Sequence, residues 1–159
     1  MPDTSFKING RVATVTANSD DTLLHVLRNH LDLKGTRYGC GLEECGSCMV
    51  LVDDKPSFAC TMPIAALANH AVTTIEGLSQ DGLMHPVQAA FLEQQAGQCG
   101  YCLSGIIMSS VALLKAKHSP TRAEIVQALE PHLCRCGAQS RMIRAVERAA
   151  VMLQAEAKA

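Results

Sequence analysis

The sequence predicts an α+β chain of two domains, a small mixed sheet packed on one helix followed by a bundle of four helices. Alternating apolar residues, which are typical of strands, dominate the first half of the 159 residues. Past residue 77 this alternation stops, and apolar residues recur at helical spacing instead. We therefore expect a first domain over residues 1–78 and a second domain over residues 79–159.

The first domain is predicted to begin with a β-hairpin. Asn9-Gly10 lies between two alternating runs, and Asn-Gly is a common two-residue hairpin turn. A two-residue turn places every second side chain of both strands on the same side of the sheet. The face expected to be apolar consists of Phe6, Ile8, Ala13 and Val15.

A helix, a second hairpin and a closing strand complete the predicted sheet domain. Asp20 or Asp21 is expected to cap a helix over residues 22–30. Three short β-rich runs follow, at residues 49–52, 57–60 and 72–75. This order of elements is that of the β-grasp fold of the ferredoxins.

Four helices are predicted in the second domain. Pro86 suits the first position of a helix, and Thr121 with Glu124 forms a capping box. Two longer apolar stripes mark the other two helices, at residues 103–117 and 140–155. Short helices joined by short connections indicate a bundle.

The first four of the eight cysteines have a distinctive spacing. Cys40, Cys45 and Cys48 read Cys-x4-Cys-x2-Cys, and Cys60 follows after eleven further residues. This is the plant-type spacing for a 2Fe–2S cluster. Three glycines are expected to give positive φ angles and to let backbone N–H groups approach the sulfurs: Gly39, Gly41 and Gly46. A zinc site or a pair of disulfides is the alternative.

The other four cysteines form two pairs, Cys99 with Cys102 and Cys134 with Cys136. Each pair precedes a predicted helix, so the positive ends of two helix dipoles point toward the thiolates. This arrangement suits an anionic iron–sulfur cluster. Zinc stays open as an alternative, because Cys-x2-Cys with a second cysteine pair is also a zinc pattern.

Composition and charge exclude several classes of protein. The formal net charge is −1 and the pI about 6.6, which favours neither nucleic acid nor an anionic membrane as partner. No apolar run approaches the roughly 18 residues of a membrane span. Residues 1–10 lack the pattern of a signal peptide. We expect a cytoplasmic location by default, with periplasmic or membrane-associated placement through a partner as the alternative. Eight cysteines without an export signal indicate metal binding rather than disulfides.

The second cysteine set carries a resemblance to a known family. Gln98-Cys99-Gly100-Tyr101-Cys102, followed by Cys134-Arg135-Cys136-Gly137 and placed behind a plant-type loop, resembles the iron–sulfur subunit of the molybdenum hydroxylases. This is the family of xanthine dehydrogenase and aldehyde oxidoreductase, and the resemblance covers about residues 4–154. It implies that both cysteine sets hold 2Fe–2S clusters and that the helical domain is the bundle found in this family.

The resemblance also implies roles for two residues next to a partner's cofactor. Gln98 matches the family glutamine that hydrogen-bonds the pterin of the molybdenum cofactor, and Cys136 is placed to touch that pterin while it ligates iron. The cofactor itself would be held by a separate large molybdopterin-binding subunit. We therefore expect an electron-transfer subunit of an oxidoreductase, with no catalytic activity of its own.

Two short departures narrow the resemblance. Leu103-Ser104-Gly105 follows the first cysteine pair, and Gly137-Ala138 follows the second. These strings resemble the branch with isoquinoline oxidoreductase, nicotinate dehydrogenase and membrane-bound aldehyde dehydrogenases. Members of that branch often lack a flavin subunit, and they pass electrons to c-type cytochromes. The implied substrate is an aldehyde or an N-heterocycle. The implied acceptor is a cytochrome c subunit, and the alternative is a flavin subunit.

Two further functions stay open at this point. A free-standing two-cluster ferredoxin or redox sensor would need no partner, whereas an apolar face on the bundle would favour a subunit. A structural zinc protein would be colourless. The six histidines are scattered without metal spacing, and His132, two residues before Cys134, is the one placed to tune a cluster.

Overall fold

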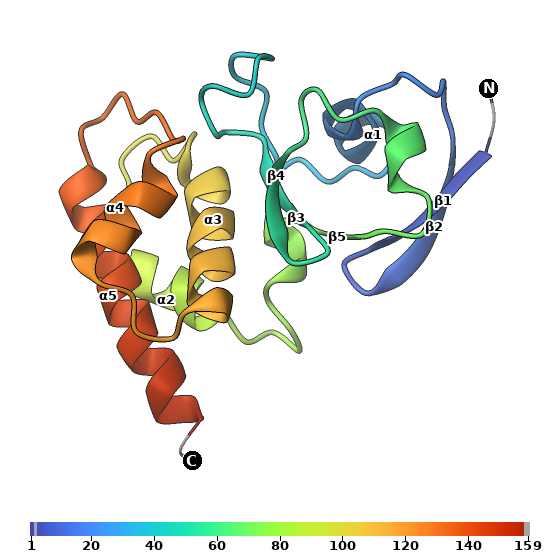
Figure 1. Cartoon of the computed structure of the whole chain (residues 1–159). Coiled ribbons are helices and arrows are strands. Elements are labelled where there is room, and N and C mark those ends of the chain that lie inside the picture. Colours follow the sequence, from blue (N-terminus) through green and yellow to red (C-terminus); the bar gives the residue numbers. More distant parts are fainter. Residues whose placement is uncertain (2, 158–159) are drawn as a thin grey trace.

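The computed structural model describes residue 1 and residues 3–157, which form two lobes (Figure 1). One lobe holds a five-stranded sheet with helix α1 (Leu23–Asn29), and the other holds four helices. The predicted α+β architecture of a sheet domain and a helical bundle is confirmed. The domain ranges 1–78 and 79–159 stay a prediction, and residues 2 and 158–159 lie outside the described part of the chain.

The sheet has the strand order β2-β1-β5-β3-β4. β1 and β5 pair in parallel, and the other neighbours are antiparallel. The predicted hairpin register is confirmed, with Phe6 opposite Ala13 and Ile8 opposite Arg11. The strands are β1 (Asp3–Ile8), β2 (Arg11–Thr16), β3 (Met49–Val52), β4 (Lys55–Phe58) and β5 (Ala71–Thr73).

The cap of α1 differs from the prediction. Thr22 is the N-cap, and its hydroxyl accepts a hydrogen bond from the backbone N–H of His25 at 3.2 Å. Asp21 instead accepts from the backbone N–H of Asn18 at 2.9 Å, and Asp20 accepts from a neighbouring serine. The two aspartates are thus used by the turn before the helix, so the prediction of Asp20 or Asp21 as the cap is wrong.

The second hairpin and the closing strand are also shifted. β4 begins at Lys55 rather than in the predicted run 57–60, because Pro56 is tolerated in an edge strand. The closing strand ends at Thr73, and a 3₁₀ turn begins at Ile75. Both shifts are two residues or less and leave the order of elements unchanged.

Four helices follow the sheet, as predicted. They are α2 (Pro86–Glu93), α3 (Leu103–Ala116), α4 (Arg122–Leu129) and α5 (Gln139–Glu156). The capping box of Thr121 and Glu124 is present at the start of α4. In the described part of the chain, none of the helices combines the length and the apolarity that a bilayer crossing needs.

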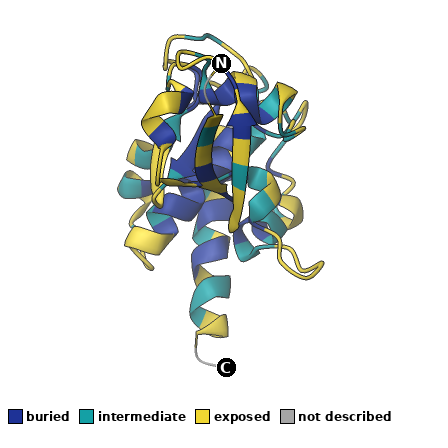
Figure 2. Cartoon of the chain, turned by 90° about the vertical axis from the view of Figure 1, so that its right-hand side faces the viewer, coloured by how far each residue is buried: buried dark blue, intermediate teal, exposed yellow. Residues whose placement is uncertain are grey.

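β3 is buried on both of its faces and joins the two lobes. Val50 packs into a core with α1 and β1, whereas Met49 and Leu51 pack into a second core with the helices. α3 contacts β3 on the side of the helices. Figure 2 shows the buried residues running through the centre of the molecule. The sheet and the bundle therefore form one continuous interface along β3.

Leu51→Ala is expected to lower the free energy of unfolding by about 2–5 kcal/mol, because it leaves a cavity at a side chain that is 0% exposed. Val12→Ala, at a side chain that is 72% exposed on the hairpin, is the control and should have little effect. Chemical unfolding of the iron-loaded chain, followed by circular dichroism, measures both. Equal losses in the two variants would contradict a shared core at β3.

Candidate metal centres

The first cysteine set is assembled by the β3–β4 hairpin. Cys40, Cys45 and Cys48 lie in the loop that leads into β3, and Cys60 follows β4. The hairpin returns the chain beside the loop, where the backbone N–H of Ala59 donates to the carbonyl of Cys48 at 3.3 Å. The fourth cysteine is thereby brought next to the other three.

Backbone N–H groups of the loop donate to two sulfurs, as predicted. Leu42 and Glu44 both donate to Cys40 Sγ at 3.3 Å, and the N–H of Cys40 donates to Cys45 Sγ at 3.3 Å. The two donations to Cys40 are the main reason why its pKa is lowered to about 7. Such donors stabilise a thiolate, which is the form that binds metal.

The loop glycines serve two different purposes. Gly41 and Gly46 have φ angles of +71°, as predicted for a tightly bent loop. Gly39 does not have a positive φ, so that prediction is wrong for this residue. A Cβ at Gly39 would lie 2.5 Å from Cys45 Sγ. Gly39 is therefore needed to leave room for a sulfur, not to turn the chain.

The second cysteine set lies at two helix N-termini, as predicted. Cys102 directly precedes α3, and Cys134 and Cys136 lie in the turn before α5. Donation from the backbone N–H of Tyr101 and contact with Cys136 lower the pKa of Cys99. Burial alone would raise the pKa of Cys134, but backbone N–H groups of the same turn outweigh it and lower that pKa.

The thiols of both sets meet in pairs. Burial and the neighbouring thiol raise the pKa of Cys48 and of Cys102 to about 12 in the absence of metal. Within the described residues, no three His, Cys, Asp or Glu side chains surround one point as ligands of a single ion would. The close pairs are Cys40 with Cys45, Cys48 with Cys60, Cys99 with Cys136, and Cys102 with Cys134. Two thiolates for each of two bridged irons is the donor set of a 2Fe–2S cluster, so the residues present fit that group.

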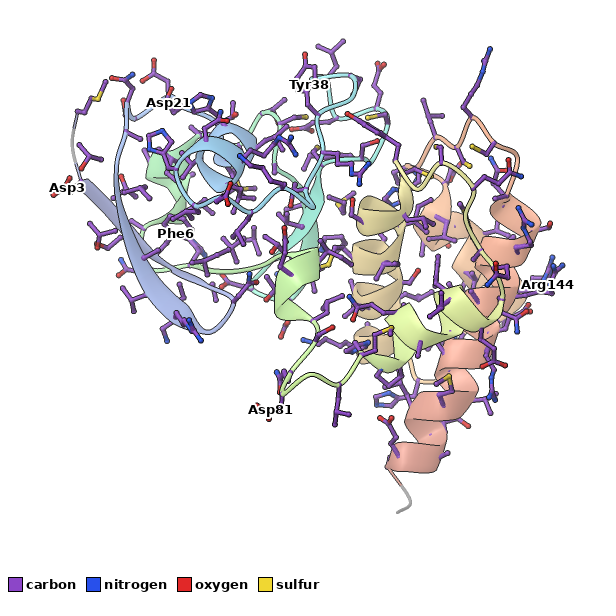
Figure 3. The ribbon with its side chains drawn as sticks, turned by 180° about the vertical axis from the view of Figure 1, so that it is seen from behind. Asp3, Phe6, Asp21, Tyr38, Asp81 and Arg144 are labelled. Carbon is purple, nitrogen blue, oxygen red and sulfur yellow. The ribbon has the colours of Figure 1, made fainter. Side chains whose placement is uncertain are left out.

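The loops of the two sets lie side by side at one end of the molecule (Figures 1 and 3). The backbone N–H of Leu133 donates to the carbonyl of Cys45 at 3.1 Å. The hydroxyl of Tyr101 donates to the backbone carbonyl of Tyr38, a residue labelled at this end of the molecule in Figure 3. The guanidinium of Arg37 lies 5.1 Å from the centre of the Tyr101 ring. These contacts were not predicted, because they join residues more than 60 positions apart.

Two glycines and a histidine allow the loops to approach α3. A Cβ at Gly105 would lie 2.0 Å from the carbonyl oxygen of Gly46, and a Cβ at Gly46 would lie 2.1 Å from Nδ1 of His132. His132 Nε2 is 2.7 Å from the hydroxyl of Ser109 on α3. Burial lowers the pKa of His132 to about 4, so the ring is neutral near pH 7. A glycine early in an apolar helix is the sequence signal that could have revealed this approach.

Gln98 is exposed and directly precedes Cys99. It lines a surface cavity of about 300 Å³ together with Leu92 and Leu103. Leu92 is among the exposed large apolar side chains of the bundle, with Tyr101 and Leu133. The predicted contact of Gln98 and Cys136 with a pterin stays a prediction.

Comparison with known families identifies both halves of the chain. The family model described as a 2Fe-2S iron-sulfur cluster binding domain matches residues 6–69, and that described as a 2Fe-2S binding domain matches residues 74–147. The chain thus contains two 2Fe–2S binding domains, in the order that the cysteine spacing predicted.

Similar proteins share nearly the full length. A nicotinate dehydrogenase subunit of Pseudomonas putida is 46% identical over 92% of this chain and 93% of its own. The alpha subunit of isoquinoline 1-oxidoreductase of Brevundimonas diminuta is 45% identical over 91% of this chain and 95% of its own.

Solved structures agree with these relatives. Quinoline 2-oxidoreductase of Pseudomonas putida matches with a TM-score of 0.92 at 30% identity, over 98% of this chain and 96% of that one. Aldehyde oxidoreductase of Desulfovibrio desulfuricans matches with a TM-score of 0.93 at 34% identity, over 98% of this chain but 18% of that one. The same two-lobed fold therefore occurs both as a separate chain and as part of a longer one. Sequence, cysteine pairing and fold together show that this chain belongs to the iron–sulfur small subunits of the molybdenum hydroxylase family, the family of xanthine dehydrogenase and aldehyde oxidoreductase.

Proposed function

We propose that the chain carries electrons from the molybdopterin centre of a large partner subunit to an external acceptor. The observation behind this proposal is that two complete sets of four cysteines lie in loops that hydrogen-bond one another. A 2Fe–2S cluster supplies one-electron chemistry, whose potential depends on hydrogen bonds and burial. The residues of this chain fix the spacing of the two centres and donate hydrogen bonds to their sulfurs.

We assign the ligands by the observed pairs of thiols. Each pair would provide two thiolates for one iron, and each set of four would hold one cluster. This assignment uses all eight cysteines, which leaves none for a disulfide. The first cluster is assigned to Cys40, Cys45, Cys48 and Cys60, and the second to Cys99, Cys102, Cys134 and Cys136.

The exposure of the second set supports its position next to the partner. Cys99 is exposed, whereas Cys45, Cys48 and Cys60 of the first set are buried. Leu92, Tyr101 and Leu133 are large apolar side chains exposed on the helical lobe, as expected of a surface that another chain covers. This surface weighs against a free-standing ferredoxin. We propose that a large molybdopterin-binding subunit docks here, with the amide of Gln98 and the side chain of Cys136 against the pterin.

The relatives guide the choice of substrate and acceptor. Two of them, at 46% and 45% identity, are named for nicotinate and isoquinoline, which are N-heterocycles. The iron–sulfur-binding subunit of an aldehyde oxidoreductase of Escherichia coli is 38% identical. We therefore place an N-heterocycle before an aldehyde as the substrate of the complex. The proposed acceptor is a cytochrome c subunit, and the alternative is a flavin subunit. We place the complex in the cytoplasm by default.

The purified chain is expected to contain about four iron and four labile sulfide, as two 2Fe–2S clusters require. Cys45→Ser should lower the content to about two iron and two sulfide per chain, because it removes a ligand of the first cluster only. Ser57→Ala, which removes a hydroxyl that donates to the backbone carbonyl of Lys55 and is no cluster ligand, is the control and should keep four iron and four sulfide. Metal and sulfide analysis with electron paramagnetic resonance measures these contents. Stoichiometric zinc without iron would refute the ligand assignment.

In the complex with its partner, Cys45→Ser should let substrate reduce the second cluster while delivery to the external acceptor collapses. Gln98→Ala should keep both clusters and slow their reduction by substrate, because the contact with the pterin is lost. Gln127→Ala, at an exposed position on α4, is the matched control and should react normally. Stopped-flow spectroscopy follows the reduction. Normal acceptor turnover in an assembled Cys45→Ser complex would contradict the proposed path.

A further inference from the structure

His132 is a buried histidine that the assignment of eight cysteine ligands leaves without a role. It follows the end of α4, precedes Cys134 by two residues, and is 7% exposed. Burying a polar ring is unfavourable unless its surroundings use the ring's polar atoms. The contacts of His132 show which parts of the molecule do so.

One side of His132 is tied to the helical lobe. Its Nε2 lies 2.7 Å from the hydroxyl of Ser109, and both groups are buried. Its backbone N–H donates to the carbonyl of Leu129, in the last turn of α4, at 3.0 Å. These two contacts fix both the position and the orientation of the ring against α3 and α4.

The other side of the ring faces the first cysteine loop. A Cβ at Gly46 would lie 2.1 Å from Nδ1, and a Cβ at Gly105 would lie 3.5 Å from Cε1. Nδ1 lies against the backbone of Gly46, without a well-formed hydrogen bond within the described residues. The next residue, Leu133, donates to the carbonyl of Cys45. Two successive residues therefore hold the same loop.

We propose that His132 is a positioning residue that sets the separation of the two cluster-binding loops and thereby the rate of electron transfer between them. Gly46 lies between Cys45 and Cys48, and Cys134 is two residues from His132. A shift of the ring therefore moves ligands of both sets. Electron-transfer rates fall steeply with distance, so a small displacement has a large effect. The inference rests on the proposed electron-transfer function.

The test is made on the assembled complex, chemically reduced so that both clusters are paramagnetic. In His132→Ala, pulsed electron paramagnetic resonance should show a weaker and broader magnetic coupling between the clusters, and transfer between them should slow severalfold. His132→Gln should restore most of the coupling, because its amide can still bond to Ser109. His118→Ala, at an exposed histidine beyond the end of α3, is the matched control and should show the unmodified coupling.

Unmodified coupling in iron-loaded His132→Ala overturns the proposal. If that variant does not retain its iron, Ser109→Ala decides, because it removes only the hydrogen-bond partner of the ring. A broader coupling in Ser109→Ala supports the proposal, and an unchanged one overturns it. The coupling between the clusters is measured without substrate. Its result is therefore independent of the test of the proposed function, in which Cys45→Ser is expected to block delivery of electrons to the acceptor.

Discussion

The close contact of α3 with the first cysteine loop is the constraint on which the rest of the structure depends. Gly105 and Gly46 meet backbone to backbone, with no room for a Cβ at position 105. This contact continues the packing of α3 against β3, where Met49 and Leu51 enter the core of the helices. Because both cysteine loops lie at this interface, the packing of the two lobes also determines the distance between the two metal centres.

Backbone N–H groups donate to sulfurs of both cysteine sets, and the second set lies at helix N-termini in addition. In the first set, the donors to Cys40 are backbone N–H groups of a bent loop. In the second set, the thiols lie at the N-termini of α3 and α5. Both arrangements favour a negatively charged group. The first set is the more buried of the two, whereas Cys99 opens to the surface of the helical lobe, where a partner subunit can cover it.

Local signals in the sequence were sufficient for most of the fold. The Asn9-Gly10 turn fixed the hairpin register, and cysteine spacing identified both sets, because these patterns act over a few residues. The cap of α1 was missed because Thr22 and two aspartates compete for it and the preceding turn takes the aspartates. The role of Gly39 depends on how the loop folds back to bring Cys45 Sγ beside it, and the contacts of His132 join segments distant in sequence, so neither follows from residue spacing alone.

The order in which the two centres receive electrons tests the central claim most directly. The unmodified complex is mixed with substrate in the absence of acceptor, and samples are frozen at successive times for electron paramagnetic resonance. The account predicts that the signal of the cluster at Cys99, Cys102, Cys134 and Cys136 appears first and that of the other cluster follows. A signal from the cluster at Cys40, Cys45, Cys48 and Cys60, while the second set is still oxidised, would contradict it.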